Sequence, residues 1–252
     1  MNAKYNRNLL SMIALATLVV VLAGCGSSRT TASSSPASAS ANSGAPLPAP
    51  SEGGFDVLLV DNSNPDLIVA RQDDIKTVVA DTARRHRTLV IAAIDAGPLR
   101  TASWHTVPFG RYYAEAKPKR TAQQKVNALA AGLVPQVVKL GQAKQTADGS
   151  GQIGGIQAAG ELGNLGRIFV VTDGIPNATG VPDVHSANQG EIKTASKRLG
   201  AQISGLTDVP VVFIGVGYGV SSDATVAKAK ALMMGTVKAA GASPTWRPAL
   251  VG

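Results

Sequence analysis

The sequence predicts an α/β fold: an open three-layer αβα sandwich in which helices cover both sides of a mostly parallel sheet. The first indication is a set of short apolar runs rich in Val and Ile, at residues 55–60, 88–94, 167–172 and 209–215. Such runs are typical of parallel strands that are buried on both faces. The second indication is that segments with helical periodicity lie between these runs, which is the alternation of an α/β protein.

The expected helices are defined by their caps and by the spacing of apolar residues. Asn64, Pro65 and Asp66 have the residue types of a helix cap and first turn, so we expect one helix that carries apolar residues from Ile68 to Val79. The clearest helical pattern runs from Val126 to Leu140.

Capping motifs mark the other helix starts. Thr121 with Gln124, and Asn188 with Glu191, each predict a capping box. Residues 222–240 form the last helical pattern. Residues 97–119 fit neither period, and we expect a long loop or an added strand there.

The amino terminus predicts an export signal. Lys4 and Arg7 precede an apolar stretch that ends in Leu22-Ala23-Gly24-Cys25. The stretch is shorter than the ~20 residues needed to cross a bilayer, and small residues precede Cys25 as at a cleavage site. The quartet resembles the lipobox of bacterial lipoproteins. That resemblance implies a signal peptide over residues 1–24 and a lipid anchor on Cys25.

The expected location is therefore the bacterial cell envelope, facing outside the cytoplasm. Gly26 and Ser27 after the cysteine resemble lipoproteins of the outer membrane, where the cell has one. Residues 25–54 are rich in Ser, Ala, Pro and Gly, so we expect a disordered linker with a reach of about 30 Å. The folded domain is expected over residues 55–244, with a tail at 245–252.

Composition excludes several protein classes. One cysteine rules out a disulfide scaffold and, if it is acylated, a cysteine protease. Aromatic residues are only 4% of the chain, which argues against a platform of stacked aromatics for nucleic acid.

Aspartates follow three of the expected strands. Ligands of open α/β sheets bind at the carboxyl ends of the strands, where Asp61, Asp95 and Asp173 stand. Carboxylate and hydroxyl oxygens suit Mg²⁺ or Mn²⁺ better than zinc. In the simpler alternative, Asp61 caps the next helix and Asp173 shapes a turn.

Several motifs together resemble the von Willebrand factor A domain. They are the Asp61-x-Ser63 turn, a glycine-rich helix start, the Thr172-Asp173-Gly174 turn and Val-Phe-Ile-Gly-Val-Gly217. The likeness covers nearly the whole folded part and implies the sheet topology of that family. It also implies a metal-ion-dependent adhesion site with Asp61, Ser63 and Asp173 as its residues.

This chain departs from the family pattern at two positions of that site. Pro65 replaces the second serine, and Gly151 stands where the family has a threonine. Ser150 or Asp148 can substitute only if the loop shifts. The resemblance therefore implies weak binding of Mg²⁺ or Mn²⁺, or none.

Two catalytic alternatives use the same residues. Gly149, Gly151 and Gly154 form a G-x-G-x-x-G start to a helix, but the polar residues 141–148 before it are not the strand that a dinucleotide fingerprint needs. An exported metal-dependent hydrolase would use Asp61, Asp95 and Asp173, but it lacks an evident general base. A metal-free structural scaffold is a third reading.

Positive charge is concentrated between Arg84 and Lys125, with nine basic residues against two acids in a chain of net charge +8. Outside the cytoplasm, anionic lipid headgroups or wall polymers are the expected partners, and no motif for specific nucleic-acid recognition is present. The alternative is a solvated face. The candidate partner-binding residues are Arg84, Arg85, Arg87, Arg111, Lys117, Lys119 and Arg120.

We therefore expect a membrane-anchored binding or scaffold domain, not an enzyme, whose partner is another envelope protein or an anionic envelope polymer.

Overall fold

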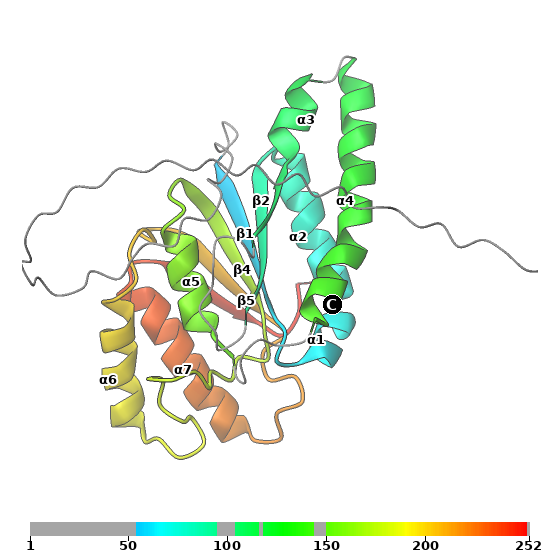
Figure 1. Ribbon diagram of the computed structural model, residues 1–252. Coiled ribbons are helices and arrows are strands. Elements are labelled where there is room, and N and C mark those ends of the chain that lie inside the picture. The colour runs from blue at the N-terminus through cyan, green and yellow to red at the C-terminus, as the bar shows by residue number, and fades with distance from the viewer. Residues whose placement is uncertain (1–53, 95–103, 116–117, 144–149, 251–252) are drawn as a thin grey trace, which may run out of the picture. The chain divides into compact units, whose positions relative to one another are not determined.

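The computed structural model describes residues 54–94, 104–115, 118–143 and 150–250. Within these residues one six-stranded sheet has the order β3-β2-β1-β4-β5-β6 (Figure 1). The strands are β1 (Phe55–Asp61), β2 (Thr88–Ile94), β3 (His105–Pro108), β4 (Leu165–Val171), β5 (Pro210–Ile214) and β6 (Ser243–Arg247). Every neighbouring pair is parallel except β2 with β3. The fold is thus α/β with a mostly parallel sheet, as the sequence predicts.

Helices alternate with the strands along the chain. They are α1 (Pro65–Ala70), α2 (Gln72–Arg84), α3 (Phe109–Glu115), α4 (Lys119–Gly141), α5 (Gln152–Gly160), α6 (Gln189–Gly200) and α7 (Asp223–Ala239). The predicted capping box of α6 is present, because Asn188 and Glu191 each accept a hydrogen bond from the other's backbone N–H. No helix in the part of the chain that the structure describes is long and apolar enough to cross a membrane.

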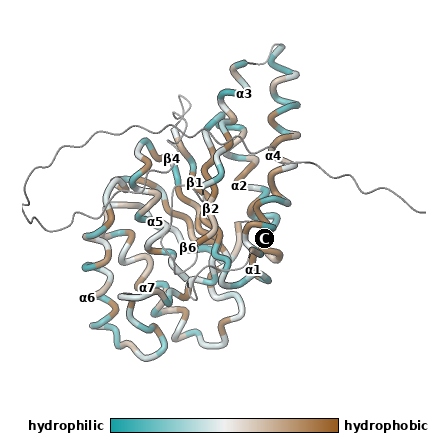
Figure 2. The backbone as a smooth tube through the Cα atoms, viewed as in Figure 1, coloured by the Kyte–Doolittle hydropathy of each residue, from teal (hydrophilic) through white to brown (hydrophobic). Residues whose placement is uncertain are grey.

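The core has two hydrophobic clusters that share the strands between them. Along β1, Val57 and Leu59 belong to one cluster, together with apolar residues of α5, α6 and α7. Leu58 and Val60 belong to the other, with residues of α1, α2 and α4. Figure 2 shows hydrophobic residues concentrated along these strands. This alternation explains why the sequences of the strands are unbroken apolar runs, since both faces of each strand are buried.

Two predicted helix boundaries are wrong. The helix expected from Pro65 onward is interrupted at Arg71, where φ is −107° and ψ is 16°. Asp73 and Asp74 lie in the first turn of α2, and acids there favour a separate helix start. The capping box of Thr121 and Gln124 does not form, because α4 already begins after Pro118, whose carbonyl accepts the Thr121 N–H at 3.0 Å.

Both edges of the sheet were incompletely predicted. The segment expected to be a loop or an added strand supplies β3 and then α3. The boundary expected at Pro244 lies inside β6, which pairs with β5 and continues to Arg247. A short strand with proline and no alternation gives little signal in a sequence.

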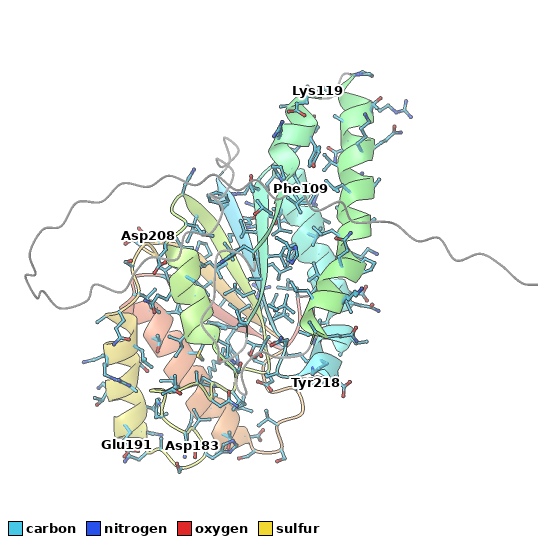
Figure 3. All side chains as sticks on the ribbon, in the orientation of Figure 1. Phe109, Lys119, Asp183, Glu191, Asp208 and Tyr218 are labelled. Atoms are coloured by element: carbon cyan, nitrogen blue, oxygen red, sulfur yellow. The ribbon has the colours of Figure 1, made fainter. Side chains whose placement is uncertain are left out.

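Helix α3 and the first half of α4 form a helical arm, defined here as residues 109–115 and 118–129. The arm extends beyond the end of the sheet (Figure 1). Figure 3 shows Phe109 at its base and Lys119 at its far end. Phe109 is fully buried, which fixes the base of the arm to the core.

Two glycines of α4 are predicted to respond in opposite ways to alanine. A Cβ on Gly141 would lie 2.7 Å from Val60 and 2.8 Å from Ile68, whereas one on Gly132 would meet nothing within 4 Å. We expect Gly141→Ala to lower the free energy of unfolding by about 1 to 3 kcal/mol through overpacking. Gly132→Ala should raise it by about 0.5 to 1 kcal/mol, because glycine is unfavourable within a helix. Urea denaturation measures both, and equal effects would contradict the packing described.

Candidate functional site

The candidate site lies where β1 and β4 end and α5 begins. Asp61 is the last residue of β1, and Thr172 and Asp173 directly follow β4. The two strands are parallel neighbours, with Val60 opposite Val171, so their carboxyl ends lie side by side at one end of the sheet. We call this end of the sheet the rim. It carries the sequence-predicted residues Asp61, Ser63, Ser150 and Asp173, while Asp95 and Asp148 lie outside the described residues.

Asp61 is the centre of a hydrogen-bond network. Its carboxylate is fully buried. Oδ1 accepts from the Ser63 backbone N–H at 3.1 Å and from the Ser63 hydroxyl at 2.6 Å. Oδ2 accepts from the Ser150 hydroxyl, from Gln152 Nε2 at 3.0 Å and from the Thr172 hydroxyl at 2.7 Å. A buried carboxylate needs such partners, because leaving it unpaired costs several kcal/mol.

The sequence analysis missed Gln152. This side chain is also fully buried, and its Nε2 donates to Thr172 Oγ1 at 2.9 Å and to the Ile175 carbonyl at 3.4 Å as well as to Asp61. Comparison with the family pattern directed attention to Gly151, the neighbouring position. The available signal was a polar residue at the start of a short helix that is otherwise mostly apolar and small.

Thr172 and Asn177 complete the rim. The Thr172 oxygen accepts the Gly174 N–H at 3.0 Å while its hydroxyl donates to Asp61. The Asn177 side-chain oxygen accepts the Ser150 N–H, which holds the start of α5 against the loop after β4. Three separate chain segments are therefore joined through a single carboxylate and its neighbours.

Asp173 stands beside this network without sharing its hydrogen bonds. Its Oδ1 accepts the Ile175 N–H at 2.9 Å. Burial raises the pKa of Asp173 above its usual value, and the charge of Asp61 raises it further. The hydrogen bonds from Ile175 and Asn64 act in the opposite direction. Asp173 is the half-buried carboxyl of the rim and Asp61 the enclosed one.

The residues of the rim, as arranged, do not fit Mg²⁺ or Mn²⁺. Both oxygens of Asp61 are taken by five donors, and the Gln152 amide hydrogens point at the oxygen that a cation would need. A cation and an N–H donor compete for the same lone pairs. Among the residues that the structure describes, no group of three or more His, Cys, Asp or Glu side chains is arranged to hold a metal ion.

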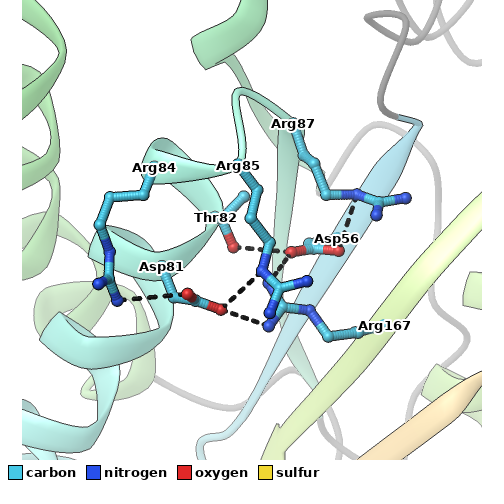
Figure 4. Close-up of polar contacts among 7 residues, drawn as sticks. All are labelled: Asp56, Asp81, Thr82, Arg84, Arg85, Arg87 and Arg167. Atoms are coloured by element: carbon cyan, nitrogen blue, oxygen red, sulfur yellow. Dashed lines mark hydrogen bonds and ion pairs between the residues drawn. The ribbon is translucent and has the colours of Figure 1, made fainter. Parts of the chain in front are cut away.

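Three of the predicted partner-binding residues are in a separate ion-pair network at the opposite end of β1 (Figure 4). Arg84 and Arg85 pair with Asp81 at 3.2 and 3.1 Å, and Arg87 lies 3.2 Å from Asp56. Arg167 bridges both aspartates. The side chains of Arg84 and Arg85 are 68% and 54% exposed and remain accessible to a partner.

Arg87 has a structural role instead. Its side chain is 20% exposed, and Asp56 is fully buried. A Cβ on Gly166 would lie 2.2 Å from the Arg87 guanidinium carbon, so glycine is needed there to leave room for this side chain. Asp56, Asp81 and Arg167 were not predicted, since a single acid within a strand gives no indication of its partners.

The other predicted basic residues belong to the helical arm. Arg111 pairs with Glu115 at 2.7 Å. Lys119 donates to the Tyr113 carbonyl at 3.2 Å and lies 4.8 Å from the centre of the Tyr113 ring. Arg120 is exposed, and Lys117 lies outside the described residues, as Cys25 does.

Substitution of Gln152 tests the network. We expect Gln152→Leu to lower the free energy of unfolding by about 1 to 3 kcal/mol, because Asp61 and Thr172 would lose a buried donor. Gln157→Leu, on the same helix at a half-buried position, should change it by less than about 0.5 kcal/mol. Chemical denaturation of both variants measures the difference, and similar losses would show that Gln152 is ordinary packing.

The raised pKa of Asp173 predicts a pH-dependent stability. The folded state binds a proton more tightly than the unfolded state, so stability falls as pH rises from the usual aspartate pKa through the raised one. We expect Asp173→Asn to melt at a higher temperature than the wild type near pH 7. The advantage should shrink as pH approaches about 4. Thermal melts across this range check the prediction, and a difference independent of pH would refute it.

Comparison with known proteins assigns no family to this chain. No known protein family matches it, and no curated protein matches it. The likeness to the von Willebrand factor A domain therefore depends on the residues already described.

Proposed function

We propose that this protein is a lipid-anchored protein of the bacterial cell envelope whose domain binds a macromolecular partner and does not catalyse a reaction. In this proposal Cys25 carries the lipid and the linker connects it to a three-layer αβα domain of the von Willebrand factor A type. The two core clusters on alternate residues of β1 support that architecture.

The main support for the proposal is the set of hydrogen bonds that the Asp61 carboxylate accepts. Five donors from Ser63, Ser150, Gln152 and Thr172 surround it. Because these donors come from three segments, they hold the loops after β1 and β4 and the start of α5 in one shape. The rim then presents Asn64 and Asp173, both half-buried, and exposed Asn177 as a preformed surface that needs no cation.

The same observation disfavours the hydrolase alternative. A metal-dependent hydrolase needs carboxylate oxygens that are free to hold the cation, together with access for substrate. The hydroxyls of Ser63, Ser150 and Thr172 all donate to one enclosed carboxylate, and Thr172 and Ser150 are themselves buried. A binding surface fits this arrangement better than a reaction centre.

A photo-crosslinking amino acid at Thr179, which is exposed and lies two residues after Asn177 of the rim, tests partner binding in cells. We expect a discrete crosslinked species from Thr179 and none from Gln202, an exposed control position after α6. The combined variant Asp61→Ala with Gln152→Ala should remove it, because the rim would lose its shape. Crosslinking at both positions, or at neither, would contradict the proposed surface.

Two further measurements separate the alternatives. The detergent-solubilised wild type should show no saturable heat with Mg²⁺ or Mn²⁺ and no hydrolysis of phosphate esters. Activity that Asp61→Ala abolishes would establish the hydrolase instead. Cys25→Ser should release the chain from the membrane fraction, and retention there would overturn the lipid anchor.

A further inference from the structure

The chain enters the fold at one defined end of the sheet. The Gly54 carbonyl accepts the Thr88 N–H at 3.1 Å, and the Phe55 N–H donates to the Asn164 carbonyl at 3.0 Å. Asp61 lies at the other end of the same strand. The chain therefore enters the domain at the end opposite the rim.

The helical arm lies at this same end. Phe55 of β1 pairs with Thr88 of β2, and Thr88 pairs with Pro108, the residue immediately before α3. From that point the arm extends past the sheet, with Lys119 at its far end (Figure 3). Arg84 and Arg85, which precede β2, are also at this end.

The arm is basic, and some of its positive charge lies where it destabilises a helix. Its described residues contain Arg111, Lys119, Arg120 and Lys125 against one acid, Glu115. Lys119 and Arg120 occupy the first turn of α4, where the helix dipole disfavours positive charge. By contrast α1, α2, α6 and α7 all have an acid in the first turn.

The start of α4 also lacks a side-chain cap, because Pro118 provides no side-chain hydrogen bond to the first turn. The start of a helix together with basic side chains attracts phosphate groups. The basic residues at this helix start are therefore unfavourable for the helix itself but suited to an external anionic partner.

An aromatic side chain accompanies these charges. Tyr112 is 45% exposed, one of two large hydrophobic side chains exposed to that degree within the described residues. It lines a hollow of about 350 Å³ with Glu115, Lys125 and Leu129. A tyrosine beside lysine and arginine is the combination found where proteins meet the headgroup layer of a membrane.

We propose that the helical arm is the surface through which the anchored domain contacts anionic phospholipid headgroups. This inference rests on the proposed lipid anchor, because the anchor and the arm leave the domain at the same end. A linker with a reach of about 30 Å keeps the arm near the bilayer. One lipid and a basic patch together give firmer attachment than either alone. The contact directs the rim away from the membrane toward its partner.

The test uses the mature lipoprotein reconstituted into vesicles of phosphatidylcholine alone or with about a third phosphatidylglycerol. A fluorophore is attached to a cysteine introduced at Gln124, which is exposed on the arm, or at Ser221, which is exposed in the loop before α7. An aqueous collisional quencher then reports shielding. With anionic lipid we expect quenching at Gln124 to fall about twofold and quenching at Ser221 to stay unchanged.

Charge reversal provides the matched control. Lys119→Glu, Arg120→Glu and Lys125→Glu together should abolish the shielding. The same change of charge on α6 and α7 should leave the shielding intact. The control substitutions are Lys193→Glu, Lys197→Glu and Lys230→Glu, all at exposed positions. Circular dichroism verifies that both triple variants are folded.

The outcomes distinguish the inference from the anchor. The inference is overturned by equal quenching in both vesicle types or by shielding that survives charge reversal on the arm. If the wild type does not float with neutral vesicles, the lipid anchor is wrong, and the inference fails with it.

Discussion

The buried carboxylate of Asp61 is the constraint on which the rest of the rim depends. A charge without solvent contact must be surrounded by donors, and no single loop supplies enough of them. Ser63 comes from the end of β1, Ser150 and Gln152 from the start of α5, and Thr172 from the end of β4. Removing any one segment would leave the carboxylate short of partners. The network therefore couples the position of α5 to the pairing of two central strands, and the shape of the rim follows from it.

A neutral amide has a different consequence from a metal ion in such a network. Gln152 satisfies Asp61 and Thr172 without adding charge, so the negative charge of Asp61 remains uncompensated at the rim. Burial raises the pKa of Asp173, and the charge of Asp61 beside it raises the pKa further. A divalent cation would act in the opposite direction and favour ionised carboxylates. The rim of the protein as described thus keeps the negative charge of Asp61.

Sequence reasoning predicted what depends on periodicity and failed where long-range contacts decide. Four central strands were predicted because each is apolar on both faces, and the caps at Asn64 and Asn188 followed from local residue types. The break at Arg71 and the strand β6 depend on weak local signals that tertiary context resolves. The hydrogen-bond partners of Gln152 and the Asp56–Arg167 pair could not have been predicted, since the paired residues are distant in sequence. The position of the rim was predictable from strand ends, but the identity of its central donor was not.

The two ends of β1 show why the domain has two distinct surfaces. Asp56 and Asp61 are both fully buried acids on the same strand. Asp56 forms ion pairs with Arg87 and Arg167 and accepts the Thr82 hydroxyl, whereas all donors to Asp61 are neutral. The positive charge of the arginine partners is larger than the negative charge of Asp56. Neutral donors, by contrast, leave the negative charge of Asp61 uncompensated. At the start of β1 four arginines therefore surround two aspartates, Asp56 and Asp81, which leaves a net positive charge there, and the basic residues of the helical arm add to it. Two buried carboxylates on a single strand, one paired with arginines and one with neutral donors, thus give the two ends of β1 a different electrostatic character.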